Sequence, residues 1–130
     1  TTTIAFGHAS TVEMLLEQRF PHSLGLLFNA FTHFLGFEVN EGEYKVMGLA
    51  PYGEPRLVEP ILANLLDLKP DGSFRLNLDY FDFLHGTRMT SDGFERLFGR
   101  AREPGAPISR RETLLQTSLK TARNNAVVAG

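Results

Sequence analysis

The hydrophobic residues of this chain gather in two short runs at its start and then recur at helical spacing further along. β-branched and aliphatic side chains dominate Thr1–Phe6 and Thr11–Phe20. The Gly-His-Ala-Ser tetrapeptide between the two runs is typical of a short turn. The pattern therefore predicts two antiparallel strands joined as a hairpin.

A helix is predicted after the second run. Pro21 ends that run, and Ser23 is suited to cap a helix that begins behind it. Apolar residues then recur at helical spacing, at Leu24, Leu27, Phe28, Phe31, Phe34 and Leu35. Small or polar residues line the other face, and these are Gly25, Asn29, Thr32 and Gly36. Solvent exposure explains that face, and so does the close approach of another backbone or a ligand.

Further helices and one strand are predicted in the middle of the chain. A short helix is expected within Glu41–Gly53, a longer one over Arg56–Leu68, and another after Ser91. Pro60 is compatible with the second of these only in its first turn. Apolar and polar residues alternate over Phe74–Leu78, as in a half-buried strand.

The last third of the chain predicts a linker and a final helix. Arg100–Ile108 contains two prolines and a glycine and is the best linker candidate. Ser109 and Glu112 have the spacing of a capping box, which would open a helix. Its apolar residues are Leu115, Leu119, Ala122 and Ala126. A hairpin followed mainly by helices predicts an α/β fold whose sheet is too small to stand alone.

Composition narrows the range of partners. The chain has 130 residues, 42% of them hydrophobic, which is enough for one core. It has no cysteine, which excludes a disulfide framework and fits a cytoplasmic location. Its 13 basic and 15 acidic residues are scattered, so we expect no nucleic-acid partner. The longest apolar stretch, Leu24–Phe37, is too short to span a bilayer, so we expect no membrane partner.

The first residues predict that the chain was cut out of a longer protein. Thr1–Gly7 has no initiator Met, no positively charged region and no cleavage site, so it is not a signal peptide. It has the pattern of a strand entered midway. We therefore expect the chain's function to depend on residues outside it.

The spacing of the histidines and of the potential nucleophiles indicates neither a metal site nor a catalytic nucleophile. His8, His22, His33 and His85 are not three or four residues apart, so no helical metal site is predicted. Turn, surface or partly buried histidines are the more common explanation. A nucleophile elbow is also absent from the sequence.

The segment Gly42–Gly53 is the one candidate for ligand chemistry. Glycines flank the charged pair Glu43 and Lys45 at the start of a short helix, where a phosphate would be favoured and a carboxylate could accept ribose hydroxyls. The segment is not the lysine loop of P-loop ATPases. A glycine-bounded helix with solvated charges explains the same residues and is the more common case.

Several runs of this sequence together resemble the carbamoyltransferases that decorate nodulation factors and antibiotics. They are Arg19–Phe28, Leu35–Phe37, Gly42–Gly53, Asp71–Asn77, Asp79–Phe81, Phe98–Gly99 and Arg111–Glu112. The run Gly-Glu-Tyr-Lys-Val-Met-Gly-Leu-Ala-Pro-Tyr-Gly is the most specific of them. The resemblance extends over about residues 1–113.

The resemblance implies part of an ATP-dependent O-carbamoyltransferase. Enzymes of this family have an actin-like, ribonuclease H-like domain and a second domain that makes a carbamoyl-adenylate. They use ATP and carbamoyl phosphate, and pass the carbamoyl group to a hydroxyl of a small-molecule acceptor with help from a bound iron ion. On this pattern Thr1–Phe20 is the second and third strand of the ribonuclease H-like sheet, and Ser23–Phe37 is the helix packed on it.

The same resemblance implies a nucleotide contact at four residues. These are Gly42, Glu43, Lys45 and Gly48. Lys45 would face a phosphate or pair with an acid, and Glu43 would hold the ribose or fix the loop.

The chain also departs from the family pattern. The family's paired-histidine metal motif and Asp-Gly-x-Gly loop would precede Thr1, and its Gly-Gly-x-x-x-Asn segment would follow Gly130. No catalytic residue or metal ligand is therefore assigned in this chain. Leu114–Gly130, where Asn124-Asn125 is expected to interrupt the helix, does not resemble the family. We thus divide the chain into a partial actin-like carbamoyltransferase domain, residues 1–113, and an atypical or truncated C-terminal helix, residues 114–130.

Two hypotheses follow. In the first, the chain is a carbamoyltransferase fragment that contributes part of the nucleotide site, is inactive alone, and has the rest of its own enzyme as its partner. In the second, it is a non-catalytic nucleotide-binding or interaction remnant that has lost the chemistry.

Overall fold

A β-hairpin leads the chain. The computed structural model describes residues 1–84, 86 and 88–129, with side chains described as far as residue 125. Strands β1 (Thr2–His8) and β2 (Thr11–Gln18) pair antiparallel. The predicted hairpin is confirmed, but its turn is only Ala9-Ser10, because β1 continues to His8.

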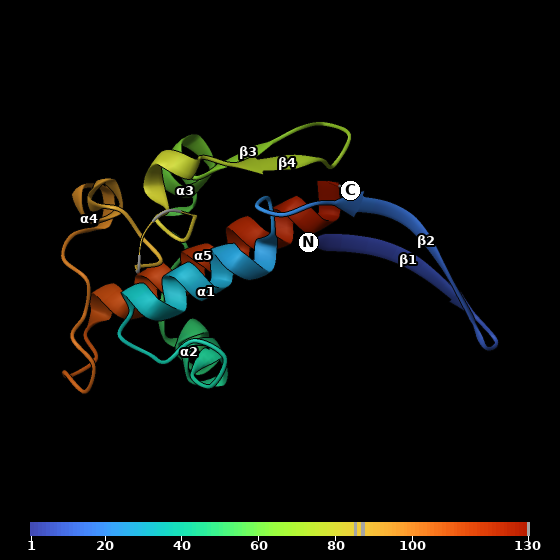
Figure 1. Cartoon of the computed structure of the whole chain (residues 1–130). Helices are drawn as coiled ribbons and strands as arrows, with labels where there is room; N and C mark the ends of the chain where they lie inside the picture. Colours follow the sequence, from blue (N-terminus) through green and yellow to red (C-terminus); the bar gives the residue numbers. More distant parts are fainter. Residues whose placement is uncertain (85, 87, 130) are drawn as a thin grey trace.

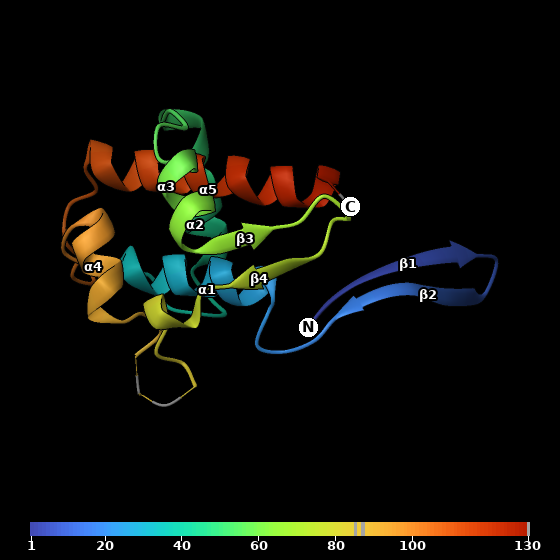
Figure 2. The same ribbon diagram turned by 90° about the horizontal axis from the view of Figure 1, so that it is seen from above.

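The hairpin extends away from the helices, as Figures 1 and 2 show from two directions. Helix α1 (Leu24–Phe34) packs instead against α2 (Glu43–Leu49) and α5 (Arg110–Ala129). The expected packing of the helix on the sheet of residues 1–20 is therefore wrong within this chain, because other helices bury the apolar face of α1. The hairpin base is joined to α1 by a hydrogen bond from the Leu24 N–H to the Thr2 Oγ1, 3.1 Å long.

Helix α1 confirms the prediction from helical periodicity. The Ser23 hydroxyl accepts a hydrogen bond from the Leu26 N–H at 3.4 Å, which is the predicted N-cap contact. Leu27, Phe31 and Phe34 are fully buried on the inward face. A cap and an apolar stripe, both readable from the sequence, thus determine where this helix starts and which way it faces.

The small residues opposite that stripe have separate explanations. Gly25 is exposed, as solvation of this face predicts. Thr32 is buried, and its hydroxyl donates to the Phe28 carbonyl at 2.9 Å. Gly36 has φ +80°, and a Cβ there would lie 2.6 Å from the Arg102 carbonyl oxygen. The close approach of another backbone, one of the two explanations offered by the sequence, therefore holds at Gly36.

Phenylalanines from two helices make the centre of the core. Helix α4 (Asp92–Phe98) begins after Ser91, as predicted. Its Phe94 ring lies 4.7 Å from Phe34, 5.0 Å from Phe98 and 5.1 Å from Phe31, measured between ring centroids. Tilted aromatic pairs of this kind contribute about 0.5–1.5 kcal/mol each beyond the burial of their surface. These contacts hold α4 to α1.

The middle helix is shorter than predicted. Helix α3 (Val58–Asn64) has Pro60 in its first turn, as required, but ends well before Leu68. Residues Leu66–Leu68 form β3 instead and pair antiparallel with β4 (Phe74–Leu76). The predicted helix from about residue 56 to residue 68 therefore forms near its expected start, but its predicted C-terminal end is wrong. A returning partner strand, which local periodicity does not reveal, decides the outcome.

The predicted strand is confirmed in its first part. Phe74 and Leu76 are buried and Arg75 between them is exposed, which is the expected alternation. Leu78 leaves the strand and starts a short 3-10 helix, η2 (Leu78–Tyr80).

The loop between α4 and α5 is attached to the C-terminal end of α1. The Arg102 N–H donates to the Phe34 carbonyl at 3.0 Å, and its guanidinium Nε donates to the Leu35 carbonyl at 2.5 Å. The same guanidinium lies 4.7 Å from the centroid of the Phe37 ring. The predicted linker is therefore irregular in backbone but attached to the end of α1.

Helix α5 runs without a break from Arg110 to Ala129. The expected interruption at Asn124-Asn125 is wrong. Leu115, Leu119 and Ala122 are buried as predicted, and the side chain of Ala126 lies outside the described residues. The division of the chain at residue 113 stays a prediction, although one helix spans that position.

The described residues contain two two-stranded sheets and five α-helices, so the α/β prediction is confirmed at this level. Within them, no helix combines the length and the apolar character needed to span a membrane.

Candidate functional site

The segment predicted to contact a nucleotide forms α2 and a following 3-10 helix, η1 (Ala50–Tyr52). Its inward side packs on α5. Val46 and Ala50 are buried there, and the Thr117 hydroxyl donates to the Ala50 carbonyl at 2.7 Å. Figure 1 shows α2 beside α1, away from the hairpin. The segment is thus a short helical unit with one packed side and one open side.

Gly42 has a structural reason to be glycine. Its N–H donates to the Glu38 carbonyl at 2.6 Å in the turn before α2. A Cβ at Gly42 would lie 2.8 Å from the Phe37 Cβ and 2.9 Å from the Glu38 carbonyl oxygen. The turn therefore needs a residue without a side chain, and Gly42 is buried within it.

Glu43 fixes the same turn. Its Oε1 accepts a hydrogen bond from the Asn40 N–H at 2.6 Å. Asn40 has φ +72°, a left-handed conformation that asparagine tolerates better than most residues. The contact supports one of the two predicted roles of Glu43, that of fixing the loop.

Lys45 and Gly48 lie on the open side of α2, where both are exposed. The Lys45 Nζ is 5.8 Å from the centroid of the Tyr44 ring. A Cβ at Gly48 would meet nothing within 4 Å, so packing inside this chain does not require glycine there. The structure thus separates the four predicted residues: Gly42 and Glu43 build the turn, whereas Lys45 and Gly48 face outward.

The last glycine of the segment is a requirement that sequence reasoning missed. A Cβ at Gly53 would lie 2.2 Å from the Thr113 carbonyl oxygen and 2.4 Å from the Thr117 Oγ1. Such distances are far below van der Waals contact, so Gly53 lets η1 approach the backbone of α5. The signal that could have found it is its place at the end of the specific glycine-bounded run.

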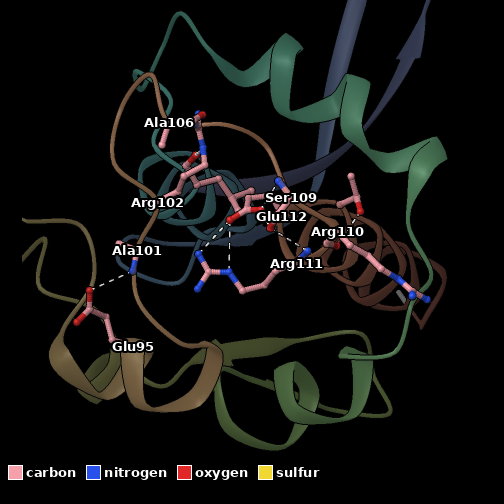
Figure 3. A network of polar contacts seen from close by, with 10 residues as sticks. Glu95, Ala101, Arg102, Ala106, Ser109, Arg110, Arg111 and Glu112 are labelled. Atoms are coloured by element: carbon pink, nitrogen blue, oxygen red, sulfur yellow. Dashed lines mark hydrogen bonds and ion pairs between the residues drawn. The ribbon is translucent and has the colours of Figure 1, made fainter.

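A second group of family-like residues meets at the start of α5, where Figure 3 shows a polar network. Glu112 is buried, with 2% of its surface exposed. Its carboxylate accepts hydrogen bonds from the Ser109 N–H at 2.8 Å and from the Arg111 Nη2 at 3.0 Å, and the Ser109 hydroxyl donates to it as well. The Glu112 half of the predicted capping box is therefore confirmed.

The electrostatics of this network favour an ionised Glu112. Burial by itself raises the pKa of Glu112, but the hydrogen bonds from Ser109 and Arg111 outweigh it and lower the pKa below its ordinary value. Gly99 has φ +88°, and a Cβ there would lie 3.0 Å from the Arg111 Nη1. The run Phe98–Gly99 and the pair Arg111-Glu112 are thus neighbours in space, with a structural role.

His22 is a further residue that spacing arguments did not single out. Its Nδ1 accepts a hydrogen bond from the Leu76 N–H at 3.1 Å, which links the hairpin base to β4. Burial lowers the pKa of His22, and the charge of Arg75 adds to the effect. A neutral imidazole is required for this contact, because a protonated Nδ1 cannot accept.

The described residues do not fit an iron site. They contain no group of three or more His, Cys, Asp or Glu side chains that could hold a metal ion. The Nδ1 of His22 is already engaged with a backbone N–H, and His85 lies outside the described residues.

Two hollows on the described surface lie away from α2. One is lined by the base of the hairpin and the β3–β4 turn, including Thr2, Leu16 and Asp71. The other is lined by residues of η2 and α4, including Tyr80 and Arg96. Neither hollow is lined by one of the four predicted contact residues, of which Lys45 and Gly48 are exposed on α2.

Comparison with known proteins supplies the family. The model of the family described as Carbamoyltransferase N-terminus matches residues 3–127. The expectation that the resemblance ends at about residue 113 is therefore wrong. The chain is 49% identical over 129 residues to the uncharacterized protein sll1178 of Synechocystis sp. (strain ATCC 27184 / PCC 6803 / Kazusa), which is 98% of this chain and 21% of that protein.

Two nodulation proteins are also similar. Nodulation protein NolNO of Sinorhizobium fredii is 31% identical over 124 residues, which is 95% of this chain and 17% of that protein. Nodulation protein NolO of Bradyrhizobium diazoefficiens is 36% identical over 76 residues, which is 58% of this chain and 14% of that protein. The chain spans about a fifth or less of the length of these relatives. The match over nearly all of its residues means that the chain belongs to the carbamoyltransferase N-terminus family.

Proposed function

We propose that this chain is part of an ATP-dependent O-carbamoyltransferase, which moves a carbamoyl group from carbamoyl phosphate to a hydroxyl of a small-molecule acceptor. Within that enzyme, the outward face of α2 contributes to the nucleotide site. The observation that carries the proposal is the position of Lys45 and Gly48, which are exposed side by side with no packing reason for the glycine.

The charge and shape of this face suit a phosphate. The Lys45 ammonium is a strong hydrogen-bond donor that has no carboxylate partner among the described ion pairs. A cation close to a phosphate contributes a few kcal/mol, on the order of 2–3, once both are partly shielded from water. Gly48 leaves room for a ligand to approach the helix backbone. Gly42 and Glu43 support the face indirectly, by holding the turn that precedes it.

The proposal extends to the rest of the enzyme. It assigns to this chain part of an actin-like, ribonuclease H-like domain in the cytoplasm, and assigns the iron ligands and the adenylate-forming domain to residues outside it. No catalytic residue is assigned within the chain. ATP is therefore the one cofactor for which residues of this chain are proposed as contacts.

Replacing Lys45 in the complete enzyme tests the nucleotide contact. We expect Lys45→Ala to raise the KM for ATP by about tenfold or more, because losing one charge-assisted contact costs at least about 1.4 kcal/mol, while the KM for carbamoyl phosphate changes little. Lys120→Ala is the matched control, since Lys120 is also an exposed lysine on a helix. Steady-state kinetics with each substrate varied in turn measure both constants.

An unchanged KM for ATP in a folded Lys45→Ala enzyme would contradict the contact. In that case Lys45 is a solvated surface cation, whose interactions contribute less than about 1 kcal/mol.

A non-catalytic interaction remnant is the second candidate. The segment that contains Lys45 also exposes two aromatic side chains, with 66% of Tyr44 in α2 and 79% of Tyr52 in η1 accessible to solvent. Exposed aromatic residues of this kind suit a protein partner as well as a ligand. Carbamoyl transfer by the complete protein separates the two hypotheses, because the remnant would show none.

A further inference from the structure

The hollow between η2 and α4 has a mixed lining and is separate from the α2 face. Its volume is about 330 Å³. Small-molecule sites in proteins typically measure about 300–1,000 Å³, so the hollow has room for one small ligand. An aromatic ring, an amide, a carboxylate and a guanidinium line it together with a glycine and a leucine, and these belong to Tyr80, Asn77, Asp79, Arg96, Gly93 and Leu97.

Two charged side chains of the hollow have no partner among the hydrogen bonds and ion pairs of the described residues. They are the Asp79 carboxylate and the Arg96 guanidinium, and both residues are exposed. The Asn77 Oδ1 accepts from the Asp79 N–H at 3.2 Å, which leaves the amide NH₂ of Asn77 as a donor. The hollow thus offers a ligand both donors and an acceptor, with one charge of each sign.

Tyr80 supplies an aromatic surface that the backbone holds in place. Its N–H donates to the Asn77 carbonyl at 3.2 Å, and its carbonyl accepts from the Ser91 N–H at 3.0 Å. A Cβ at Gly93 would lie 3.4 Å from the Tyr80 Cδ1, which is ordinary contact. A longer side chain at position 93 would therefore cover part of the ring. Glycine at this position leaves the half-buried ring accessible from the hollow.

These groups together fit a neutral ring that carries several hydroxyls. A hydroxyl both donates and accepts, so neighbouring hydroxyls are able to donate to Asp79 and accept from Arg96. The negative face of the Tyr80 ring attracts the polarised C–H bonds on the flat side of a pyranose. Asp79 would repel an anion and Arg96 would repel a cation, which favours a neutral ligand over either.

We propose that the hollow between η2 and α4 binds a pyranose, either a free monosaccharide or the end unit of a saccharide chain. The site goes beyond the nucleotide contact proposed for α2 and shares no residue with it. Its occupation by a sugar requires neither ATP nor carbamoyl phosphate.

Titration of this chain with glucose tests the proposal. We expect saturation-transfer NMR to detect binding through the C–H protons of glucose, with a Kd on the order of 1–10 mM for so small a ligand. The amides of Tyr80, Gly93 and Arg96 should shift during the titration. Inorganic phosphate and methylammonium are the charged probes. Shifts of these amides with either ion but not with glucose would overturn the proposal, because the hollow would then be an ion site.

Substitution of the two charged residues locates the hydrogen bonds. We expect Asp79→Ala and Arg96→Ala each to raise the Kd for glucose at least about fivefold, because each leaves a hydroxyl of the bound sugar without its partner. Arg100→Ala is the matched control, since Arg100 is also exposed, follows α4 and does not line the hollow. It should change the Kd by less than about twofold, as a solvated surface cation would. Equal Kd values in all three variants would place glucose elsewhere and overturn the proposal.

Two further substitutions change the shape of the hollow. Gly93→Leu fills it, and we expect the Kd for glucose to rise more than about tenfold while the Tm stays the same or increases, since leucine forms helices better than glycine. Tyr80→Phe keeps the ring and should bind within about threefold of the wild type, whereas Tyr80→Leu should bind at least about fivefold more weakly. Wild-type affinity in a folded Gly93→Leu variant would contradict the site.

Comparison of maltose with glucose distinguishes the two sources of the pyranose. Maltose bound at least about fivefold more tightly indicates a saccharide chain, since further contacts are made, and equal affinity indicates a free monosaccharide. Either result supports the proposal. If the isolated chain does not fold, the titration is made on this chain grafted into the sll1178 protein in place of its matched segment, where glucose binding that is absent, or unchanged in Arg96→Ala, overturns the proposal. No readout involves carbamoyl transfer, so failure here is distinct from failure of the proposed function.

Discussion

Three glycines of the segment Gly42–Gly53 have different surroundings, crowded at two positions and open at the third. Gly42 and Gly53 are surrounded by backbone atoms of Glu38 and Thr113, so each occupies a place that no side chain fits. Gly48 lies in the same run but on the open side of α2. The run of residues looks uniform in sequence, yet only the contacts of each glycine decide whether it is structural.

Alanine substitution distinguishes the crowded glycine positions from the open one. We expect Gly53→Ala to destabilise the chain by more than about 2 kcal/mol, since its Cβ would overlap the Thr113 carbonyl oxygen. Gly48→Ala should be neutral or stabilise by up to about 1 kcal/mol, because alanine is the better helix former and the space is open. Urea denaturation of both variants measures the free energies of unfolding. Equal effects of the two substitutions on the free energy of unfolding would contradict the close contact between Gly53 and the backbone of α5.

His22 gives the chain a pH-dependent link between the hairpin base and β4. Its folded-state pKa lies below the ordinary value of 6.5, through burial and then Arg75, so the unfolded chain takes up the proton more readily than the folded one. Stability is therefore complete above about pH 6.5 and falls as the pH drops from there toward the lowered folded-state pKa. We expect the free energy of unfolding to decrease between about pH 7 and pH 5 for this reason.

Two histidine variants check the assignment. His22→Gln should flatten the decrease over that range, whereas His33→Gln, at an exposed position of α1, should keep it. The measurement is the free energy of unfolding in urea at several pH values. A decrease that survives in His22→Gln would place its origin at another group.

At the scale of elements, the start of α5 depends on one buried carboxylate. Glu112 accepts hydrogen bonds from Ser109 and pairs with Arg111, next to the C-terminus of α4. Removal of the carboxylate would leave the Ser109 N–H without its acceptor and Arg111 without its partner. The network thus connects the capping of one helix with the position of its neighbour.

Substitution of Glu112 tests this connection. We expect Glu112→Ala to destabilise by about 1–3 kcal/mol, through the lost cap and the unpaired donors. Glu112→Gln should lie between the wild type and Glu112→Ala, because an amide oxygen can still accept from Ser109 but carries no charge for Arg111. Thermal and urea unfolding measure the effect. A Glu112→Ala variant as stable as the wild type would show that the network is dispensable.

Elements with strong local signals were predictable from the sequence. Helix α1 follows from the Ser23 cap and its apolar stripe, and α4 follows from the spacing of its phenylalanines. The break expected at Asn124-Asn125 was wrong, because two asparagines cost a helix only about 1.4 kcal/mol in propensity and the packed turns before them hold α5 in place. β3 was missed because three residues are too few to show a period and its partner arrives later in the chain.

At the scale of the whole molecule, the described residues form a helical core with an extended hairpin, and two of the four predicted contact residues, Lys45 and Gly48, are exposed on α2. Its described residues offer no cluster of His, Cys, Asp or Glu side chains that could hold a metal ion. Four-fifths of the sll1178 relative lies outside the matched segment. This chain thus corresponds to about a fifth of that relative's length.

We expect the isolated chain to show no carbamoyl transfer from carbamoyl phosphate and ATP. The reason is that the proposed metal ligands and adenylate-forming domain are outside it, and a partial fold does not supply the missing chemistry. The assay compares product formation by the purified chain with a heat-inactivated control. Product above the control would contradict the fragment hypothesis and call for a catalytic group within these residues.

The sequence by itself determined the order of most elements, the capping of α1, the role of Glu112 at α5, and the family resemblance that the comparison with known proteins confirmed. These features depend on residues within one or two helical turns of each other, or on a run of specific residues. Short-range contacts and a specific run of residues can both be read from the sequence without knowing which distant segments meet.

Only the tertiary structure decided that the hairpin stands away from α1, that Leu66–Leu68 is a strand, and that Gly42 and Lys45 face opposite surroundings. Each of these depends on which distant segment returns alongside. Period and propensity describe how a segment divides into two faces, but the partner that covers a face is supplied by the rest of the fold.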